Sequence, residues 1–503
     1  MKSVFRRRYV FKPYLMAFLA GFLLALPLSY PSLFFVSWFG LLPFLFNIKD
    51  ISGKKVFIRG TIMGTSLIFW SSHWLYYPLI EYSTLPFVPG LIILVFVFIL
   101  YGMIYGLWAS LYNYLKKNKE VSVFLLGISW IALEYLRYIL FSELPFGYLA
   151  YTQSAFLSLV QMAEYGGIFI VGFILVLFNG YIYKIFVYKK IRYIFPVLII
   201  LIFIISIGKW QIINYNNKDY QSIDVGIIQT SLGPSEKWDL DKETNIDNLM
   251  NKSLELDGVK LIVWPETALT FDLLRNEYYY NKFMRHFPLS KSHLQVSGHA
   301  IIESPMEIYN SSFLVSAEGE ILDRYNKMRL VPFGEYFPFV EFMEKFGVRF
   351  ASQTPGKEIS IFELDDFSWR TVICSEILYP YLLQEGILES DFIVTQSVES
   401  WYKKGNLQKQ MWSAAIFRAV ENRRSILKSA NMGYGGIISP AGISIIKEHS
   451  LDKSTISHQL PLNNEETFYQ RHGDYIGFFS LILISIILFV KLLVVFIRKK
   501  REK

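Results

Sequence analysis

Apolar runs long enough to cross a membrane dominate this sequence. A helix needs about 20 apolar residues to cross the hydrocarbon core of a bilayer. Seven such runs precede residue 210 and an eighth lies near the C-terminus, at approximately 13–29, 31–47, 57–80, 88–115, 121–141, 162–187, 192–208 and 475–497. The first two runs are short and lie on either side of Pro27 and Pro31, so a helical hairpin is an alternative for them. The runs predict a polytopic α-helical membrane protein of about eight spans.

The charge composition agrees with this class of protein. Charged residues make up 18% of the 503 residues and hydrophobic residues 53%, whereas soluble chains average about 25% charged residues. This composition excludes a disordered chain, a collagen, a coiled coil and a disulfide scaffold. The net charge of +8 is concentrated at the two ends, because the first twelve residues and the last six each contain five lysines or arginines. We interpret these ends as cytoplasmic tails rather than as part of a nucleic-acid groove.

Loops that contain lysine or arginine alternate with loops that contain neither. The basic loops lie at 48–56, 116–120 and 185–192, and the others at 81–87 and 142–161. Basic loops stay in the cytoplasm, so this alternation predicts that both termini are cytoplasmic and that residue 210 is outside. The N-terminus also has the basic start and apolar stretch of a signal peptide, but the many later spans favour an uncleaved anchor.

The segment from 210 to 474 is charged, and its apolar residues form short runs. Strands are predicted at 223–230, 260–265, 294–302, 369–373 and 391–395, hairpins at 313–325 and 437–446, and helices at 242–256 and 408–424. Strands that alternate with helices predict a mixed α/β sandwich of about 260 residues. We therefore expect a membrane domain of about seven helices at 1–209, an α/β domain at 210–474, and a final span with a basic tail at 475–503.

The chain contains one cysteine, Cys374, in the domain that we place outside the cytoplasm. A lone cysteine there is either a reactive thiol or a small buried core residue. Cys374 ends the predicted strand at 369–373, so a nucleophile at this position would project from the edge of a sheet. A Cys–His pair with His293 or His299 is an alternative, although nothing in the sequence positions either histidine. The sequence has no G-x-S-x-G, P-loop, H-E-x-x-H or Cys/His metal motif.

Two other predicted strands end in charged residues. Glu266 follows the apolar run Leu261–Pro265, and Lys327 follows the strand that ends in Tyr325-Asn326. A carboxylate can deprotonate a thiol, and an ammonium group can stabilise a thiolate or an oxyanion. Each charge alone is most simply a solvated strand end, but together with Cys374 they indicate a catalytic site.

Three short motifs carry a specific resemblance. They are V-W-P-E at 263–266, Y-N-K at 325–327 with L-V-P-F-G-E-Y-F-P at 330–338, and I-C-S-E at 373–376. These motifs resemble the three catalytic strings of the nitrilase superfamily, whose domain is an α-β-β-α sandwich. With the membrane spans around it, the chain resembles the apolipoprotein N-acyltransferase family over nearly its whole length. The segments 133–137 and 145–153 also resemble the membrane half of that family.

The resemblance implies a role for each matching residue. It implies that Glu266 is the general base, Lys327 the oxyanion stabiliser and Cys374 the nucleophile. It implies supporting roles for Glu335 and Glu376, an aromatic position near the acyl site for Trp238, and a backbone oxyanion donor at Ser375.

Two departures from the family pattern concern the same region. Ser375 stands where the family commonly has tyrosine, and Val398-Glu399-Ser400 replaces a polar Asn-Asp pair upstream of Trp401. These departures affect the expected details of substrate binding and leave the three catalytic positions unchanged.

The resemblance also implies the reaction, its partners and its location. An acyl chain would move from a phospholipid to the N-terminal amine of an S-diacylglyceryl-cysteine apolipoprotein, through a thioester acyl-enzyme and without a metal or other cofactor. The donor and the acceptor are both anchored in the bilayer, and no nucleic acid takes part. The expected location is the bacterial cytoplasmic (inner) membrane, with the catalytic domain outside.

Two other functions fit parts of the sequence. A membrane-tethered nitrilase-type amidase would need a water-filled entrance and would gain nothing from eight spans. A transporter or scaffold would place polar residues inside several spans, where we find chiefly Glu134 and Arg137, one turn apart. These two residues predict a local ion pair, with binding of a lipid headgroup as the alternative.

Overall fold

The computed structural model describes most of the chain and divides it into two compact units. The described residues are 2–81, 86–116, 121–141, 145–256, 258–287, 292–303, 306–332, 334–336, 352–402 and 405–501. The first unit comprises 1–76, 85–213 and 471–503, and the second comprises 77–84 and 214–470. Parts of the loops at 81–87, 116–120 and 142–161, and Phe333, Phe337 and Pro338 of the motif at 330–338, lie outside the described residues.

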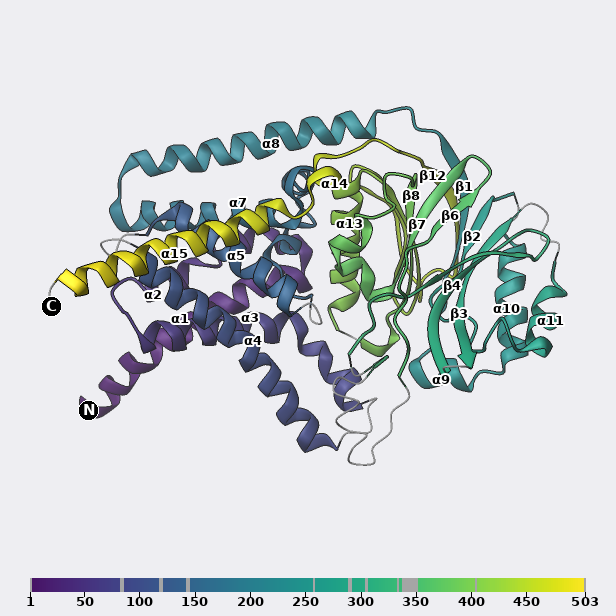
Figure 1. The fold of residues 1–503 in the computed structure, drawn as a ribbon, viewed down its shortest axis with the longest axis horizontal. Coiled ribbons are helices and arrows are strands. Elements are labelled where there is room, and N and C mark those ends of the chain that lie inside the picture. The colour runs from purple at the N-terminus through teal and green to yellow at the C-terminus, as the bar shows by residue number, and fades with distance from the viewer. Residues whose placement is uncertain are drawn as a thin grey trace. The chain divides into compact units, whose positions relative to one another are not determined.

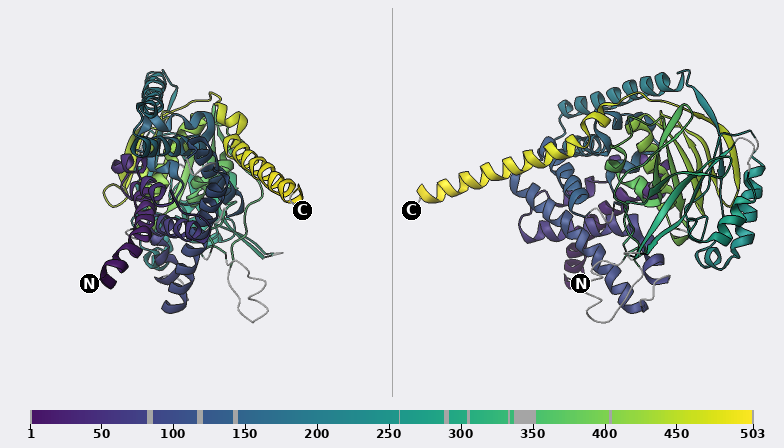
Figure 2. Two further views of the ribbon diagram at one scale, coloured as in Figure 1. Left: turned by 90° about the vertical axis from the view of Figure 1, so that its left-hand side faces the viewer. Right: turned by 45° about the vertical axis from the view of Figure 1, so that its right-hand side comes forward.

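The first unit is helical (Figure 1). Its long helices are α1 (Lys2–Ser29), α3 (Lys54–Ser72), α4 (Phe87–Leu115), α5 (Val123–Leu140), α7 (Ala163–Tyr188), α8 (Ile194–Asn216) and α15 (Tyr475–Arg501). The shorter helices are η1 (Pro31–Trp38), α2 (Leu42–Asn47), η2 (His73–Leu75), η4 (Leu149–Gln153), α6 (Leu157–Val160) and η5 (Ile191–Tyr193). Within the described part of the chain, six helices are long and apolar enough to cross a membrane. They include α15, which runs as one straight helix to the C-terminal end (yellow in Figure 2).

The apolar helices differ in how much of their surface the protein covers. In α5, 67% of the apolar stretch is buried, compared with 17% in η5 and α8 together and 11% in α15. Apolar side chains that no protein covers are stable in contact with lipid chains but not with water. The structure therefore agrees with the prediction of a multi-pass membrane protein.

Two of the predicted spans differ from the helices that form. The run at 31–47 is not one long helix, because a turn separates η1 from α2 and Pro43, in the first turn of α2, cannot donate a backbone hydrogen bond. The run at 57–80 ends early, since α3 stops at Ser72. There the indole of Trp74 donates a 3.0 Å hydrogen bond to the freed carbonyl of Ser71. Helix η3 (Tyr77–Glu81) already belongs to the second unit.

Helices α3 and α4 pack closely because glycines face each other between them. A Cβ atom at Gly64 would lie 2.6 Å from the Cβ of Tyr105, and one at Gly106 would lie 2.8 Å from the carbonyl oxygen of Phe57. Each helix has two glycines four positions apart at this contact, Gly60 and Gly64 in α3 and Gly102 and Gly106 in α4. Small residues with this spacing allow helix backbones to approach in a membrane, where packing rather than the hydrophobic effect drives association. This contact joins two of the helices that the sequence predicts as separate spans.

The second unit contains two sheets of six described strands each. The first sheet has the order β12 (Thr455–Pro461), β1 (Ser222–Ile228), β2 (Leu261–Val263), β3 (His293–Glu303), β4 (Met306–Val315) and β5 (Ile321–Asn326). The second has the order β11 (Ser444–His449), β10 (Tyr434–Ile438), β9 (Ser425–Asn431), β8 (Phe392–Val398), β7 (Phe367–Ile373) and β6 (Ile361–Leu364). The helices are α9 (Pro234–Asp239), α10 (Lys242–Leu254), α11 (Glu277–Met284), α13 (Leu407–Asn422) and α14 (Phe468–His472), with short turns η6 (Cys374–Leu378), η7 (Pro380–Leu383) and η8 (Ser400–Tyr402).

The two sheets form the inner layers of a sandwich, and helices form its outer layers (Figure 1). Helices α10 and α11 bury Ile246, Leu249 and Phe283 against the first sheet. Helix α13 covers the second sheet (Figure 1). Between the sheets, the amide of Gln295 on β3 donates a 3.0 Å hydrogen bond to the hydroxyl of Thr371 on β7. The expected α-β-β-α sandwich is therefore confirmed.

Parallel strands at the centre of each sheet bring chain segments to a common edge. Strands β1, β2 and β3 are parallel, as are β7, β8 and β9, whereas the remaining neighbours are antiparallel. The five predicted strands, both hairpins and both helices are confirmed, with ends shifted by a few residues. The sequence predicts none of β6, β9 and β12. In β9 the buried Lys428 at the centre of the strand conceals its buried character.

Candidate active site

Cys374 occupies a strained turn at the end of β7. It is the first residue of η6, and its φ angle of 54° lies in the left-handed region. Residues with a Cβ atom rarely adopt this conformation, and it occurs often at functional sites. The side chain is 5% exposed, and its Sγ donates a 3.8 Å hydrogen bond to the carbonyl oxygen of Val398. The turn therefore directs the only thiol of the chain toward the end of β8.

Glu266 lies just beyond β2, and both of its carboxylate oxygens accept hydrogen bonds. Oε1 accepts from the Asn310 amide at 2.8 Å and from Lys327 Nζ at 3.2 Å, and Oε2 accepts from the Val398 N–H at 2.8 Å. The Cys374 thiol also acts on this carboxylate and lowers the pKa of Glu266. Val398 therefore contacts Glu266 through its N–H group and Cys374 through its carbonyl oxygen.

Lys327 is 1% exposed and lies between two carboxylates. Its ammonium group is 3.2 Å from Glu266 Oε1 and 2.7 Å from Glu335 Oε1. The Asn310 amide bridges the same two carboxylates, at 2.8 and 3.1 Å. The other Glu335 oxygen accepts a hydrogen bond from the Val331 N–H at 2.8 Å. The charge-assisted hydrogen bond from Lys327 to Glu335 therefore restricts the position of the ammonium group.

The pKa values of these groups follow from their mutual charges. Burial would raise the pKa of Glu266, but Lys327, Lys237 and the hydrogen bond from Cys374 together lower it below its usual value. Burial and the Glu266 charge raise the pKa of Cys374 well above the usual range. Burial opposes the charge of Lys327, but the two neighbouring carboxylates raise its pKa well above normal. The resting site thus contains an ionised carboxylate beside a neutral thiol.

Glu376 has a different role from Glu335, because it joins two chain segments. Its carboxylate accepts backbone hydrogen bonds from Ile373 at 2.7 Å, Met328 at 2.7 Å and Arg329 at 2.9 Å, and one from the Tyr325 hydroxyl at 3.0 Å. The side chain is fully buried. Glu376 therefore ties the turn that carries Cys374 to the segment that carries Lys327.

Replacing Glu376 with glutamine should destabilise the protein. The amide has one oxygen and directs an NH₂ group at N–H donors, so at least one buried hydrogen bond is lost. We expect a loss of about 2–4 kcal/mol in the free energy of unfolding, together with lower activity. Thermal unfolding in detergent would measure this. Glu335→Gln, which changes a partly exposed carboxylate, should lower activity with a smaller change in Tm. An unchanged Tm for Glu376→Gln would contradict the assignment.

Trp238 and Ser375 lie in less enclosed positions. Trp238, in α9, is 46% exposed and stacks on His299, with ring centroids 5.8 Å apart. Ser375 is the second residue of η6. The first N–H groups of a helical turn have no partner inside it, so they can bind a developing negative charge. The ring of His299 therefore packs on Trp238, whereas the alternative of a Cys–His pair would have placed it against Cys374.

Sequence reasoning missed several residues around Cys374. Asn310 is the first of three consecutive buried polar residues in β4, and this run was a usable signal. Val398 acts through its backbone and gave no signal. Lys237 immediately precedes the predicted Trp238, and its side chain is buried. Tyr402 was also missed. Its pKa is raised well above the usual value, mainly by burial and to a smaller extent by Cys374.

The segment that departs from the family pattern contains a buried ion pair. Glu399 Oε1 is 2.5 Å from Lys428 Nζ, which also donates a 2.7 Å hydrogen bond to the hydroxyl of Ser397. All three side chains are buried. A buried pair with a hydrogen-bonded neighbour restricts the backbone to one arrangement. Here it fixes the end of β8, where Val398 contacts both Glu266 and Cys374.

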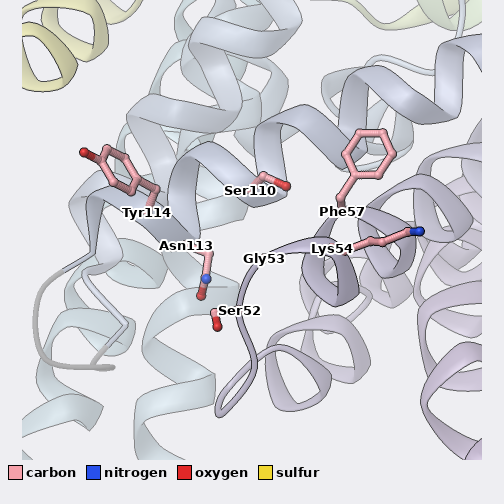
Figure 3. A pocket seen from close by; sticks show the side chains of 7 residues that line it. All are labelled: Ser52, Gly53, Lys54, Phe57, Ser110, Asn113 and Tyr114. Atoms are coloured by element: carbon pink, nitrogen blue, oxygen red, sulfur yellow. The ribbon is translucent and has the colours of Figure 1, made fainter. Parts of the chain in front are cut away.

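The first unit contains a pocket formed by residues that are distant in sequence from the candidate active site. It has a volume of about 540 Å³ and is lined by Ser52, Gly53, Lys54, Phe57, Ser110, Asn113 and Tyr114 (Figure 3). These residues come from the start of α3, the loop before it and the end of α4. None of them belongs to the predicted site. Among the described residues, no group of three His, Cys, Asp or Glu side chains is placed to hold a metal ion.

Two family models match the chain. The apolipoprotein N-acyltransferase N-terminal domain matches residues 20–181, and the carbon-nitrogen hydrolase domain matches residues 224–465. The apolipoprotein N-acyltransferase of Geobacter metallireducens is 26% identical over 486 residues, which cover 92% of each chain. That of Aquifex aeolicus is 29% identical over 449 residues, which cover 86% of this chain and 94% of its own. An amidase structure from Nesterenkonia sp. is 16% identical, with a TM-score of 0.36, covering 48% of this chain and 91% of that one.

The apolar helices, the two-sheet domain and the matches to the two family models together define a multi-pass membrane protein that carries an acyltransferase domain of the nitrilase superfamily. The chain belongs to the apolipoprotein N-acyltransferase family. The family implies that its substrates are lipoproteins.

Proposed function

We propose that this protein transfers an acyl chain from a phospholipid to the N-terminal amine of an S-diacylglyceryl-cysteine apolipoprotein. The transfer proceeds through a thioester on Cys374. The observation that carries this proposal is the shared contact of Glu266 and Cys374 with Val398, next to the ion-paired Lys327. A base, a nucleophile and a cation converge there in a buried site, as acyl transfer requires.

The first half of the reaction forms the acyl-enzyme. Glu266 removes the thiol proton, and the Cys374 thiolate attacks the ester carbonyl of the phospholipid. The ammonium group of Lys327 and the N–H of Ser375 stabilise the oxyanion. The C–O bond of the ester then breaks, and Glu266 returns the proton to the departing lysophospholipid.

The second half transfers the acyl group to the acceptor. The neutral α-amine attacks the thioester carbonyl, and Glu266 takes up a proton from the attacking nitrogen. The C–S bond breaks, the thiolate regains its proton, and the product is an amide. Two easier steps replace one difficult step. Atoms and protons balance in both halves without a metal or nucleotide.

The proposed topology matches these lipid substrates. We assign 1–209 to a membrane domain, 210–474 to the catalytic domain outside the cytoplasm, and 475–503 to a last span with a cytoplasmic tail. The location is the bacterial inner membrane, with both termini in the cytoplasm. A catalytic domain attached to spans at both ends remains near donors and acceptors that are themselves anchored in the bilayer.

Topology reporters should give opposite results at two positions. The alternation of basic loops supports an outside location for residue 230 and an inside location for the C-terminus. An alkaline phosphatase fusion after residue 230 should be active, and one after Lys503 should be inactive; a fluorescent reporter that requires the cytoplasm should show the reverse. A cytoplasmic signal at residue 230 would contradict the topology and the access to lipid substrates outside.

Mass spectrometry of a lipoprotein N-terminus tests the function itself. Cells with this protein as their sole enzyme of this type should yield lipoproteins with one more amide-linked acyl group than cells without it. Cells that express Cys374→Ala serve as the control and should lack that group. Lipoproteins of unchanged mass, together with hydrolysis of small amides by the purified protein, would favour the membrane-tethered amidase instead.

A further inference from the structure

A second buried lysine lies beside the candidate active site. Lys237, in α9, is 7% exposed. Its ammonium group donates a 2.9 Å hydrogen bond to the carbonyl oxygen of Glu266 and a 2.5 Å hydrogen bond to the hydroxyl of Thr267. Desolvating an ammonium group is unfavourable unless nearby groups stabilise its charge, so this burial calls for an explanation.

The contacts of Lys237 fall on the turn that directs the Glu266 side chain. Thr267 has a φ angle of 45°, which is rare for a β-branched residue. Such strain persists only where surrounding contacts hold the backbone. The Thr267 N–H donates a 2.9 Å hydrogen bond to the Ser297 hydroxyl, and Lys237 binds the other side of the turn.

Lys237 also balances the charge of the site. Among the described groups whose charges act on Cys374, the carboxylates are Glu266 and Glu335 and the ammonium groups are Lys327 and Lys237. A further carboxylate, Glu376, is stabilised by backbone N–H groups and also interacts with Lys327. The charges of Glu266, Glu335, Lys327 and Lys237 therefore cancel when the thiol is protonated. Without the Lys237 charge, one negative charge would be in excess, and ionised Glu266 would become less favourable.

We propose that Lys237 is a positioning residue that orients Glu266 through its main chain and, as the second cation of the site, keeps its carboxylate ionised. This inference rests on the proposed role of Glu266 as the base for Cys374. It extends that role to a residue that does not touch the reacting atoms.

The pKa of Lys237 makes the proposal testable by pH. Burial lowers it to about 8, although Glu266 and Cys374 oppose the shift. An arginine at this position would keep its charge at any pH that the protein tolerates. The titratable groups that act on Lys237, on Glu266 or on their neighbours include Cys374, Lys327, Glu335, Glu376, His299, Asp272 and Tyr402.

The experiment measures the first half of the reaction alone. Full-length protein in detergent receives phosphatidylethanolamine in mixed micelles without an amine acceptor. The rate of acyl addition to Cys374 is followed by intact-mass spectrometry from about pH 3 to about pH 10, so that the scan includes the ionisation of Glu266. In Lys237→Met the rate should be about tenfold lower or more. The acid limb of its pH–rate profile, where the rate falls as Glu266 takes up a proton, should move to higher pH by about one unit, because Glu266 ionises less readily.

Lys237→Arg separates charge from shape. It should keep the acid limb of the wild type, because arginine also places a cation beside Glu266. Lys453→Met, which removes an exposed lysine of the same unit, should match the wild type throughout. A slower Lys237→Met with an unmoved acid limb would overturn the proposal, since it would indicate a purely structural role.

Thr267→Val provides a second route if Lys237→Met does not fold. It leaves the lysine and its charge in place and removes one of its two partners, so we expect a rate several-fold lower with an acid limb close to that of the wild type. A rate equal to that of the wild type would overturn the proposed positioning role. A wild type that forms no adduct at any pH would instead show that the proposed function is wrong, and the inference would fail with it.

Discussion

Replacing Cys374 with alanine should abolish both the acyl-enzyme and the transfer of acyl groups. Wild-type protein incubated with phospholipid and no amine acceptor should gain the mass of one acyl chain, and neutral hydroxylamine should remove it. Cys374 is the only cysteine in the chain, so no other residue can carry a thioester. We expect activity to fall at least about 1000-fold, the usual effect of removing a covalent nucleophile.

Two controls sharpen this result. Cys374→Ser should be nearly inactive, because the Glu266 carboxylate, whose pKa is low, is poorly matched to a hydroxyl that is much less acidic than a thiol. Glu266→Gln should keep Cys374 but form no adduct, since the thiol loses its base. Acyl transfer that persists in Cys374→Ala would mean direct attack by the acceptor amine, and the thioester mechanism would be wrong.

Replacing Lys327 with methionine should have the second large effect, on both activity and stability. The variant leaves Glu266 and Glu335 facing each other without the buried ammonium group between them. One of the carboxylates would then take up a proton, and the oxyanion would lose a donor. We expect activity to fall about 1000-fold. The free energy of unfolding should fall by about 3–5 kcal/mol, as when one partner of a buried ion pair is removed.

A double variant separates these two effects. In Lys327→Met with Glu335→Gln, one of the facing carboxylates is neutral, so Tm should rise again while activity stays low. Lys218→Met is the matched control, because its ion pair with Glu465 is partly exposed. Such pairs contribute at most about 1 kcal/mol. Equal Tm values for Lys327→Met and Lys218→Met would contradict a central role for the buried pair.

The two supporting glutamates illustrate how structure refines a motif. Both follow a proposed catalytic residue closely in sequence, and the resemblance alone assigns them similar roles. Glu335 binds the ammonium group of Lys327, whereas Glu376 accepts hydrogen bonds from the backbone of two separate segments. Substitution of Glu335 should therefore lower mainly the activity, whereas substitution of Glu376 should lower both the activity and the stability of the protein.

The sequence by itself determined six of the eight predicted spans, the α/β class of the second unit and the strand ends that carry Glu266, Lys327 and Cys374. These features depend on local patterns: the length of apolar runs, the period of strands and the residue that follows each strand. Where a local pattern is interrupted, prediction failed. The run at 31–47 breaks at a turn, and β9 contains a buried lysine.

Only the tertiary structure decided how the three catalytic candidates meet. The backbone of Val398 contacts both Glu266 and Cys374, and a backbone group has no identity in a sequence. The buried ammonium groups of Lys237 and Lys327 are stable only because partners from distant segments surround them. Burial of a charge depends on those long-range partners, so the residues that set the charge of the site emerge only when the chain is folded.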